Sequence, residues 1–124
     1  MQIKELCSEL NLIAPSYFWS MDEATLALLT GGCGPGGVGD WFVPDTVYGL
    51  CVTAACIVHD FQYAVGTTAW EKNEADEVFL DNLRWIVDQE GGFLRRLRRA
   101  RIYVYYFMVS KFGKKAFEST AFIV

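Results

Sequence analysis

The stretch that decides the fold is TAACIVHDFQYAVG, residues 53–66, which contains the only histidine of the chain. Its apolar residues and its terminal glycine favour a helix that ends at that glycine. In such a helix Cys56, His59, Asp60 and Tyr63 would share one face, because their spacing is i, i+3, i+4 and i+7. A core helix would place aliphatic side chains there, since burying an uncompensated charge is costly. The thiol, imidazole, carboxylate and phenol on this face therefore indicate a functional site.

Capping signals predict further helices around this one. The helix that contains residues 53–66 extends back to about residue 47 if residue 45 or 46 is its N-cap, and we call it the first long helix. TAWE, residues 68–71, is a capping box that opens a second long helix to about residue 88, and the short connection makes the two helices antiparallel. SMDE, residues 20–23, predicts a shorter helix that ends at the glycine cluster 31–39. These signals predict an all-α fold, and 124 residues with 52% hydrophobic content suit a single domain, residues 1–124.

The C-terminal segment differs in charge from the rest of the chain. Residues 91–124 contain eight basic and one acidic side chain, whereas residues 1–90 contain three basic and fourteen acidic ones. The segment predicts a basic helix over residues 93–113, and the apolar positions that fit a helical stripe are Leu94, Leu97, Val104, Met108 and Phe112. Two interpretations of this helix stay open. It could lie on an anionic lipid surface, or its arginines could neutralise acidic residues of the second long helix such as Glu74, Glu77 and Asp81. We do not expect a nucleic-acid partner, because the rest of the domain is acidic.

Two features outside the first long helix complete the predicted site, namely Asp76 and the glycine cluster. Asp76 lies on the second long helix, which brings it back toward His59, and a carboxylate facing a histidine fixes its tautomer as a general base requires. The glycine cluster offers backbone carbonyls, and carbonyls with one carboxylate, such as Asp60, make a site that suits Ca²⁺. A zinc site from Cys51, Cys56 and His59 is the competing metal hypothesis, although its spacing matches no common zinc pattern.

Three motifs in this order resemble the phospholipase A2 family. They are CGPGG at 33–37, CIVHDFQY at 56–63 and ADEVF at 75–79, which look like its calcium loop, its catalytic helix and its downstream aspartate helix. The likeness covers roughly residues 31–83 and is closest to compact bacterial, fungal and parvoviral members. It implies a phospholipase A2-like fold, in which two long antiparallel helices hold the site beside a Gly-rich calcium loop and additional helices.

The resemblance also implies a role for each residue. His59 would activate a water as general base, Asp76 would hydrogen-bond its far nitrogen, and Tyr63 would support Asp76. Asp60 would bind Ca²⁺ through its side chain, and the backbone carbonyls of Gly32, Gly34 and Gly36 would be the other protein ligands. Cys33 and Cys56 stand where the family has a disulfide, while Cys7 and Cys51 have no assigned counterpart. A longer spacing between Cys33 and His59 and a proline in the loop depart from the pancreatic and venom enzymes.

The function implied is a calcium-dependent hydrolase of lipid metabolism that cleaves the sn-2 acyl ester of glycerophospholipids at a membrane interface. Its partner would be a phospholipid membrane surface, contacted peripherally. The alternative is a non-catalytic module that uses this scaffold for binding or assembly, as a virion or effector component.

Membrane and export signals are the last features that the sequence allows us to assess. The longest uncharged, helix-compatible run, residues 46–58, is short of the roughly 20 residues that span a bilayer, so we expect no transmembrane segment. MQIKELCSEL at the start lacks the pattern of a secretory signal, so we expect none there, and export by another route stays open. The sequence leaves the localisation and the oligomeric state undefined.

Overall fold

The computed structural model describes residues 2–29 and 46–123, with side chains up to Leu28 in the first range and up to Gly113 in the second. The described elements are six helices and one hairpin. In chain order they are α1 (Ile3–Glu9), α2 (Ser16–Ser20), α3 (Glu23–Leu29), β1 (Thr46–Val47), β2 (Leu50–Cys51), α4 (Thr53–Val65), α5 (Ala69–Glu90) and α6 (Arg95–Ile123). The described part is mostly helical, which confirms the all-α class.

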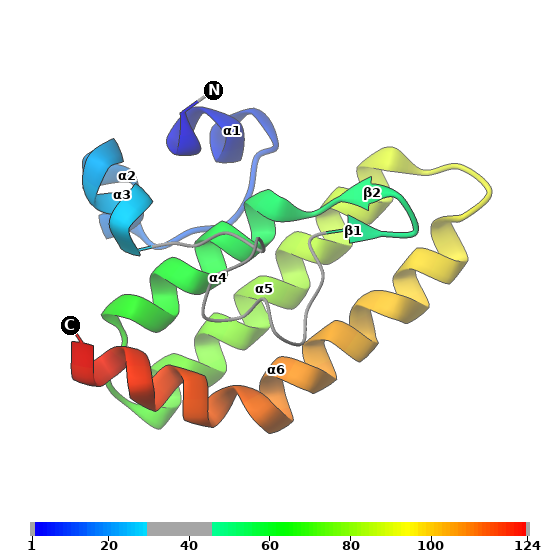
Figure 1. Cartoon of the computed structure of the whole chain (residues 1–124). Helices are drawn as coiled ribbons and strands as arrows, with labels where there is room; N and C mark the ends of the chain where they lie inside the picture. The colour runs from blue at the N-terminus through cyan, green and yellow to red at the C-terminus, as the bar shows by residue number, and fades with distance from the viewer. Residues whose placement is uncertain (1, 30–45, 124) are drawn as a thin grey trace.

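Three long helices form the body of the molecule. Figure 1 shows α4 and α5 running side by side in opposite directions, with α6 returning along α5 and the short helices α1–α3 beside α4. Each long helix places apolar side chains in the shared core, including Val58, Phe61, Phe79, Leu83, Ile102 and Val109. Phe18 of α2 packs edge-on against Phe61, with ring centroids 5.1 Å apart, and so fixes the N-terminal helices to α4.

The predicted helix ends around the α4–α5 turn are confirmed. α4 ends at Gly66, and α5 begins with a complete capping box in which the Thr68 side chain accepts from the Glu71 N–H while the Glu71 carboxylate accepts from the Thr68 N–H. The prediction for residues 20–23 is wrong in its capping residue. Asp22 caps α3 by accepting from the Thr25 N–H at 3.0 Å, while the Ser20 hydroxyl donates to a carbonyl of α2.

The predicted start of the first long helix at about residue 47 is also wrong. Residues 46–51 form an antiparallel hairpin in which Thr46 pairs with Cys51 and Val47 with Leu50, and α4 begins only at Thr53. The two residues of its turn, Tyr48 and Gly49, have φ values of 45° and 82°. This left-handed pair is the geometry that joins two strands most tightly, and it cannot continue a right-handed helix.

The basic helix is present as α6, but its buried side differs from the predicted stripe. The side chains that enter the core are Ile102, Tyr105 and Val109, whereas Leu97, Val104 and Phe112 are exposed. The sequence IYVYYFMV is apolar on every side of a helix, so its pattern cannot select the inner face. Contacts with the hairpin select it, because the Tyr105 hydroxyl donates to the Thr46 carbonyl at 2.7 Å. None of the described helices combines the length and apolarity needed to cross a membrane.

Candidate active site

His59 and Asp76 meet between α4 and α5, as the sequence predicts. His59 Nε2 lies 2.9 Å from Asp76 Oδ1, and the Tyr63 hydroxyl donates to the same oxygen at 2.6 Å. The imidazole also packs against two aromatic rings, with centroid distances of 4.2 Å to Tyr63 and 4.5 Å to Phe79. All three polar side chains are buried, and only 4% of His59 is exposed. The predicted contacts are therefore confirmed, while the catalytic roles stay predictions.

The charges of these groups determine which nitrogen of His59 holds the proton. Burial acts to raise the pKa of Asp76, but its hydrogen bonds with His59, Lys72 and Tyr63 outweigh that effect, so the pKa of Asp76 is lowered. An ionised carboxylate only accepts hydrogen bonds, so Nε2 of His59 must donate. Nδ1 is then the unprotonated nitrogen that can accept a proton.

The imidazole is held in its neutral form. Burial lowers the pKa of His59, and the charge of Lys72 lowers it further. The hydrogen bond and charge of Asp76 act in the opposite direction, but the net effect is a lowered pKa. Burial and the Asp76 carboxylate raise the pKa of Tyr63, so its hydroxyl keeps the proton that it donates to Asp76. A neutral imidazole oriented by a carboxylate is what a general base requires.

Lys72 is a member of this cluster that the sequence analysis missed. It is buried on α5 one turn before Asp76, and its Nζ donates to Asp76 Oδ2 at 2.6 Å. The same ammonium donates to the carbonyls of Val109 at 3.1 Å and Ser110 at 3.2 Å on α6. Its three donors therefore have three acceptors. The i, i+4 spacing of Lys72 and Asp76 was visible in the sequence, but such pairs are usually solvent-exposed.

The two oxygens of Asp76 have separate partners, which fixes the rotation of the carboxylate. Oδ1 accepts from His59 and Tyr63, and Oδ2 accepts from Lys72. α6 closes tightly over this arrangement, because a Cβ added to Gly113 would lie 2.5 Å from the Tyr63 hydroxyl. A glycine at this position lets the backbone of α6 approach the cluster.

Asp60 is the only predicted calcium ligand within the described residues. It is buried on α4 directly after His59, and a carboxylate is the hard oxygen donor that Ca²⁺ prefers. Gly32, Gly34 and Gly36 lie outside the described residues. Within the described ranges, no three His, Cys, Asp or Glu side chains form a group that could hold a metal ion. Cys51, Cys56 and His59, the residues of the zinc hypothesis, do not form such a group in the described structure.

The described cysteines have different surroundings. Cys7 is a buried free thiol whose Sγ lies 4.0 Å from the Ala54 carbonyl, and Cys51 is an exposed free thiol on β2. Cys56 is buried on α4. Its predicted partner, Cys33, lies outside the described residues, so this disulfide stays a prediction.

The arginines of α6 do not pair with Glu74, Glu77 or Asp81. Arg95 and Arg99 contact Asp88 near the end of α5, with Nε to Oδ1 distances of 3.2 and 3.7 Å. Arg98 donates instead to the carbonyls of Val47 at 3.1 Å and Tyr48 at 2.7 Å, which attaches α6 to the hairpin. These pairings follow from the antiparallel return of α6, which brings its first turns beside the last turns of α5.

Comparisons with known proteins found no relative of this chain. No family model matches the chain, and neither a curated protein nor a solved structure matches it.

Proposed function

We propose that this chain is a calcium-dependent phospholipase A2 that hydrolyses the sn-2 acyl ester of glycerophospholipids. The observation that supports the proposal best is the bond between His59 Nε2 and Asp76 Oδ1, which leaves Nδ1 of a neutral imidazole as the base. The order of the three motifs around this pair supports the phospholipase assignment. The phospholipase A2-like fold is part of the same proposal, and the opposed directions of α4 and α5 are consistent with it.

In the proposed reaction, Nδ1 of His59 accepts a proton from the water that attacks the ester carbonyl. Asp76 keeps its hydrogen bond to Nε2 and stabilises the imidazolium that forms. Tyr63 and Lys72 hold the two oxygens of Asp76 in place, so the imidazole does not need to reorient as charge develops. The proton on Nδ1 then passes to the leaving alcohol. No covalent intermediate with the protein is needed, so the reaction requires no nucleophilic serine.

The metal part of the proposal depends on Asp60 and the carbonyls of Gly32, Gly34 and Gly36. The buried carboxylate of Asp60, next to His59, fits a hard cation. The chemistry that Ca²⁺ supplies when bound is stabilisation of negative charge on the ester oxygen and on the substrate phosphate.

The direct test is fatty-acid release from phosphatidylcholine liposomes, measured with Ca²⁺ and with EGTA. Wild-type protein should release fatty acid only with Ca²⁺. The His59→Ala variant should be slower by at least about a hundredfold, the usual contribution of a general base. Gln89→Ala, an exposed substitution on α5, is the matched control and should keep full activity. Unchanged release by His59→Ala protein with a wild-type circular dichroism spectrum would remove His59 from the mechanism.

One observation favours the alternative, a non-catalytic binding or assembly module. The cluster is enclosed, with 4% of His59 exposed, so an ester reaches Nδ1 only after neighbouring residues move. A protein that kept this cluster only for stability would need no such opening. The same liposome assay separates the two functions, because the binding module should release no fatty acid with or without Ca²⁺.

A further inference from the structure

The outward side of α6 presents an apolar stripe. Leu97, Val104 and Phe107 are 54%, 43% and 52% exposed, and Ala100 lies exposed between them. These positions are separated by three or four residues, so they share one side of the helix. The opposite side of α6 is the one that packs into the core. The stripe is therefore an apolar surface that no described part of the chain covers.

Basic side chains border this stripe. Arg96 and Arg101 are exposed on its two edges, and Lys111 is exposed one turn beyond Phe107. Neither Arg96 nor Lys111 has a salt bridge to any described residue, and Arg101 lies over the Tyr105 ring at 5.9 Å. Residues 91–113 contain six basic and no acidic side chains. Residues 91–113 therefore supply no acidic side chain to neutralise the positive charge around the stripe.

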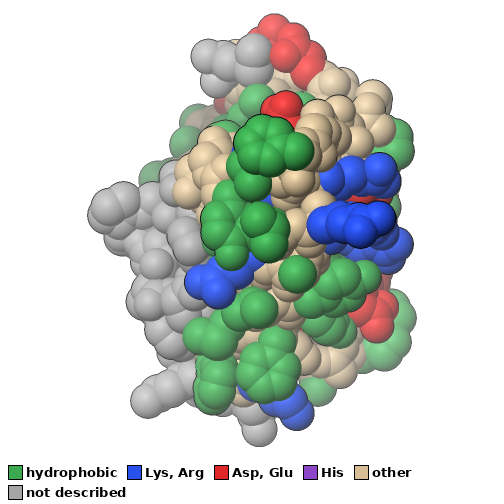
Figure 2. Space-filling view, turned by 90° about the vertical axis from the view of Figure 1, so that its right-hand side faces the viewer, with side chains coloured by type: hydrophobic (Ala, Val, Ile, Leu, Met, Phe, Trp, Pro, Cys, Tyr) green, Lys and Arg blue, Asp and Glu red, His purple; other side chains and the backbone are tan. Residues whose placement is uncertain are grey.

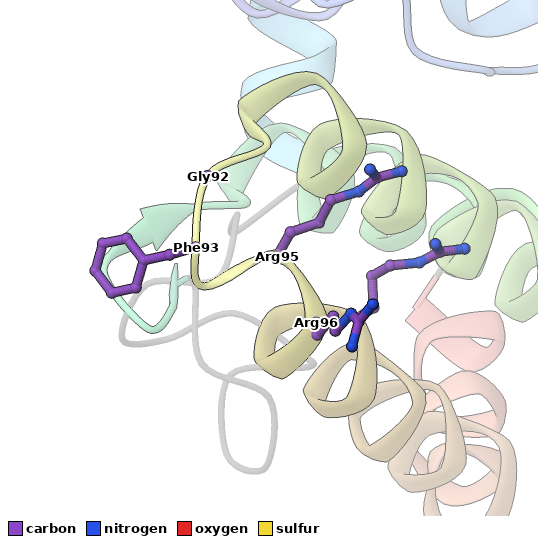
Figure 3. Close-up of a pocket in the computed structure, with 5 residues that line it drawn as sticks. Gly92, Phe93, Arg95 and Arg96 are labelled. Carbon is purple, nitrogen blue, oxygen red and sulfur yellow. The ribbon is translucent and has the colours of Figure 1, made fainter.

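The turn that leads into α6 also combines exposed apolar and basic side chains. A surface pocket of about 500 Å³ is lined by Gly92, Phe93, Arg95, Arg96 and Arg99. Figure 3 shows Phe93 projecting from the turn on one side, with Arg95 extending to the other. Figure 2 looks onto this end of the molecule, where hydrophobic side chains lie at the surface beside a group of Lys and Arg side chains. An exposed phenyl ring next to guanidinium groups repeats the pairing seen along the helix.

We infer that this basic–apolar face of α6, formed by Leu97, Val104 and Phe107 with Arg96, Arg101 and Lys111, docks on an anionic lipid surface. Such a surface satisfies both components, because its headgroups attract the cations and its acyl boundary accepts the apolar side chains. A second copy of the chain would bring the same basic residues together with no acidic side chain in 91–113 to pair with them. Nucleic acid would pair with the cations but would leave the apolar stripe facing phosphate and water.

The proposed function includes peripheral contact with a lipid membrane, and the inference identifies the face of α6 that makes this contact. Binding by this face could occur without catalysis, so the inference rests on the proposed function only for the purpose of the binding. The inner side of α6 contacts the site directly, through the Val109 and Ser110 carbonyls and Gly113. Docking by the outer side would place α6, a helix roughly 10 Å across, between the lipid and this cluster.

The test measures cosedimentation of the full chain with vesicles in EGTA, so binding is recorded without hydrolysis. Wild-type protein should bind vesicles containing phosphatidylserine and should bind pure phosphatidylcholine weakly. Replacing Arg96, Arg101 and Lys111 with Gln should weaken binding to anionic vesicles about a hundredfold, since each basic residue contributes about fivefold at such a surface. Leu97→Ser with Phe107→Ser should weaken it at least about tenfold through lost apolar contact.

Two matched controls use residues away from this face. Trp70→Ser removes a 71% exposed aromatic ring at the start of α5, and Lys4→Gln removes one positive charge on α1; both should bind anionic vesicles like wild type. All of these positions except the half-buried Lys4 are exposed, and circular dichroism should show an unchanged fold for every variant.

Three results would overturn the inference. They are absence of wild-type binding to anionic vesicles, equal binding by the stripe variants and wild type, or a dimer in sedimentation equilibrium that the stripe variants convert to monomer. The outcome does not depend on catalysis, because a protein that binds vesicles through α6 without releasing fatty acid would refute the proposed function alone.

Discussion

Replacing Lys72 with Met should destabilise the protein more than the same change at Lys4 or Lys111, the other lysines whose side chains the structure describes. Methionine matches the length of the side chain but removes its charge and its three hydrogen bonds, to Asp76, Val109 and Ser110. Removing one partner of a buried ion pair costs about 3–5 kcal/mol, because the other charge stays buried. Asp76 keeps two hydrogen bonds, from His59 and Tyr63, so we expect the lower end, about 3 kcal/mol.

The assay is urea unfolding at pH 7, followed by circular dichroism. A loss of about 3 kcal/mol is a large share of the 5–15 kcal/mol that is typical of a domain, and it should lower the melting temperature by roughly 10 °C. Lys111→Met is the matched control. It removes the same charge from an exposed position on α6, and the free energy of unfolding should change by less than about 0.5 kcal/mol.

A double-mutant cycle isolates the pair itself. Asp76→Asn leaves the Lys72 ammonium buried without its carboxylate, so each single variant has an uncompensated group. The double variant Lys72→Met/Asp76→Asn has no buried charge at either position, and its destabilisation should be at least about 1 kcal/mol smaller than the sum of the single effects. Additive effects, or a Lys72→Met variant within about 1 kcal/mol of wild type, would show that the ammonium is not held between α5 and α6 as described.

Two further predictions concern the same site. Asp60→Asn should raise the dissociation constant for Ca²⁺ at least about tenfold, because it removes the one formal charge proposed for the site; equal affinities in calorimetry would move the site elsewhere. The pKa of His59 lies below its ordinary value of 6.5, so the unfolded chain binds the extra proton first and the free energy of unfolding should fall as pH drops from 7 to 5. His59→Gln should flatten this dependence in urea titrations at the two pH values, and an unchanged slope would contradict the neutral, buried imidazole.

Local sequence signals determined the parts of this fold that depend on neighbouring residues. The Thr68–Glu71 capping box and Gly66 set the ends of two helices, because caps act through hydrogen bonds within four residues. The helical position of His59, together with a short turn, was enough to predict that Asp76 would face it, whereas the contact of Tyr63 with Asp76 was implied by the family resemblance. These features could be read from the sequence because helix geometry converts spacing directly into direction.

Other features depended on contacts between segments distant in the chain. Whether Lys72 is a solvated side chain or a buried cation depends on α6, whose Val109 carbonyl lies 37 residues further along the chain. The inner face of α6 depends on hydrogen bonds to the hairpin, such as that from Tyr105 to Thr46, because its apolar residues surround the helix. The hairpin itself replaces a predicted helical turn, since two left-handed residues at 48–49 reverse the chain and let Val47 reach the core. The sequence by itself determined the helices and the His59–Asp76 pair, whereas the tertiary structure decided what surrounds that pair, because burial depends on which helix arrives from elsewhere in the chain.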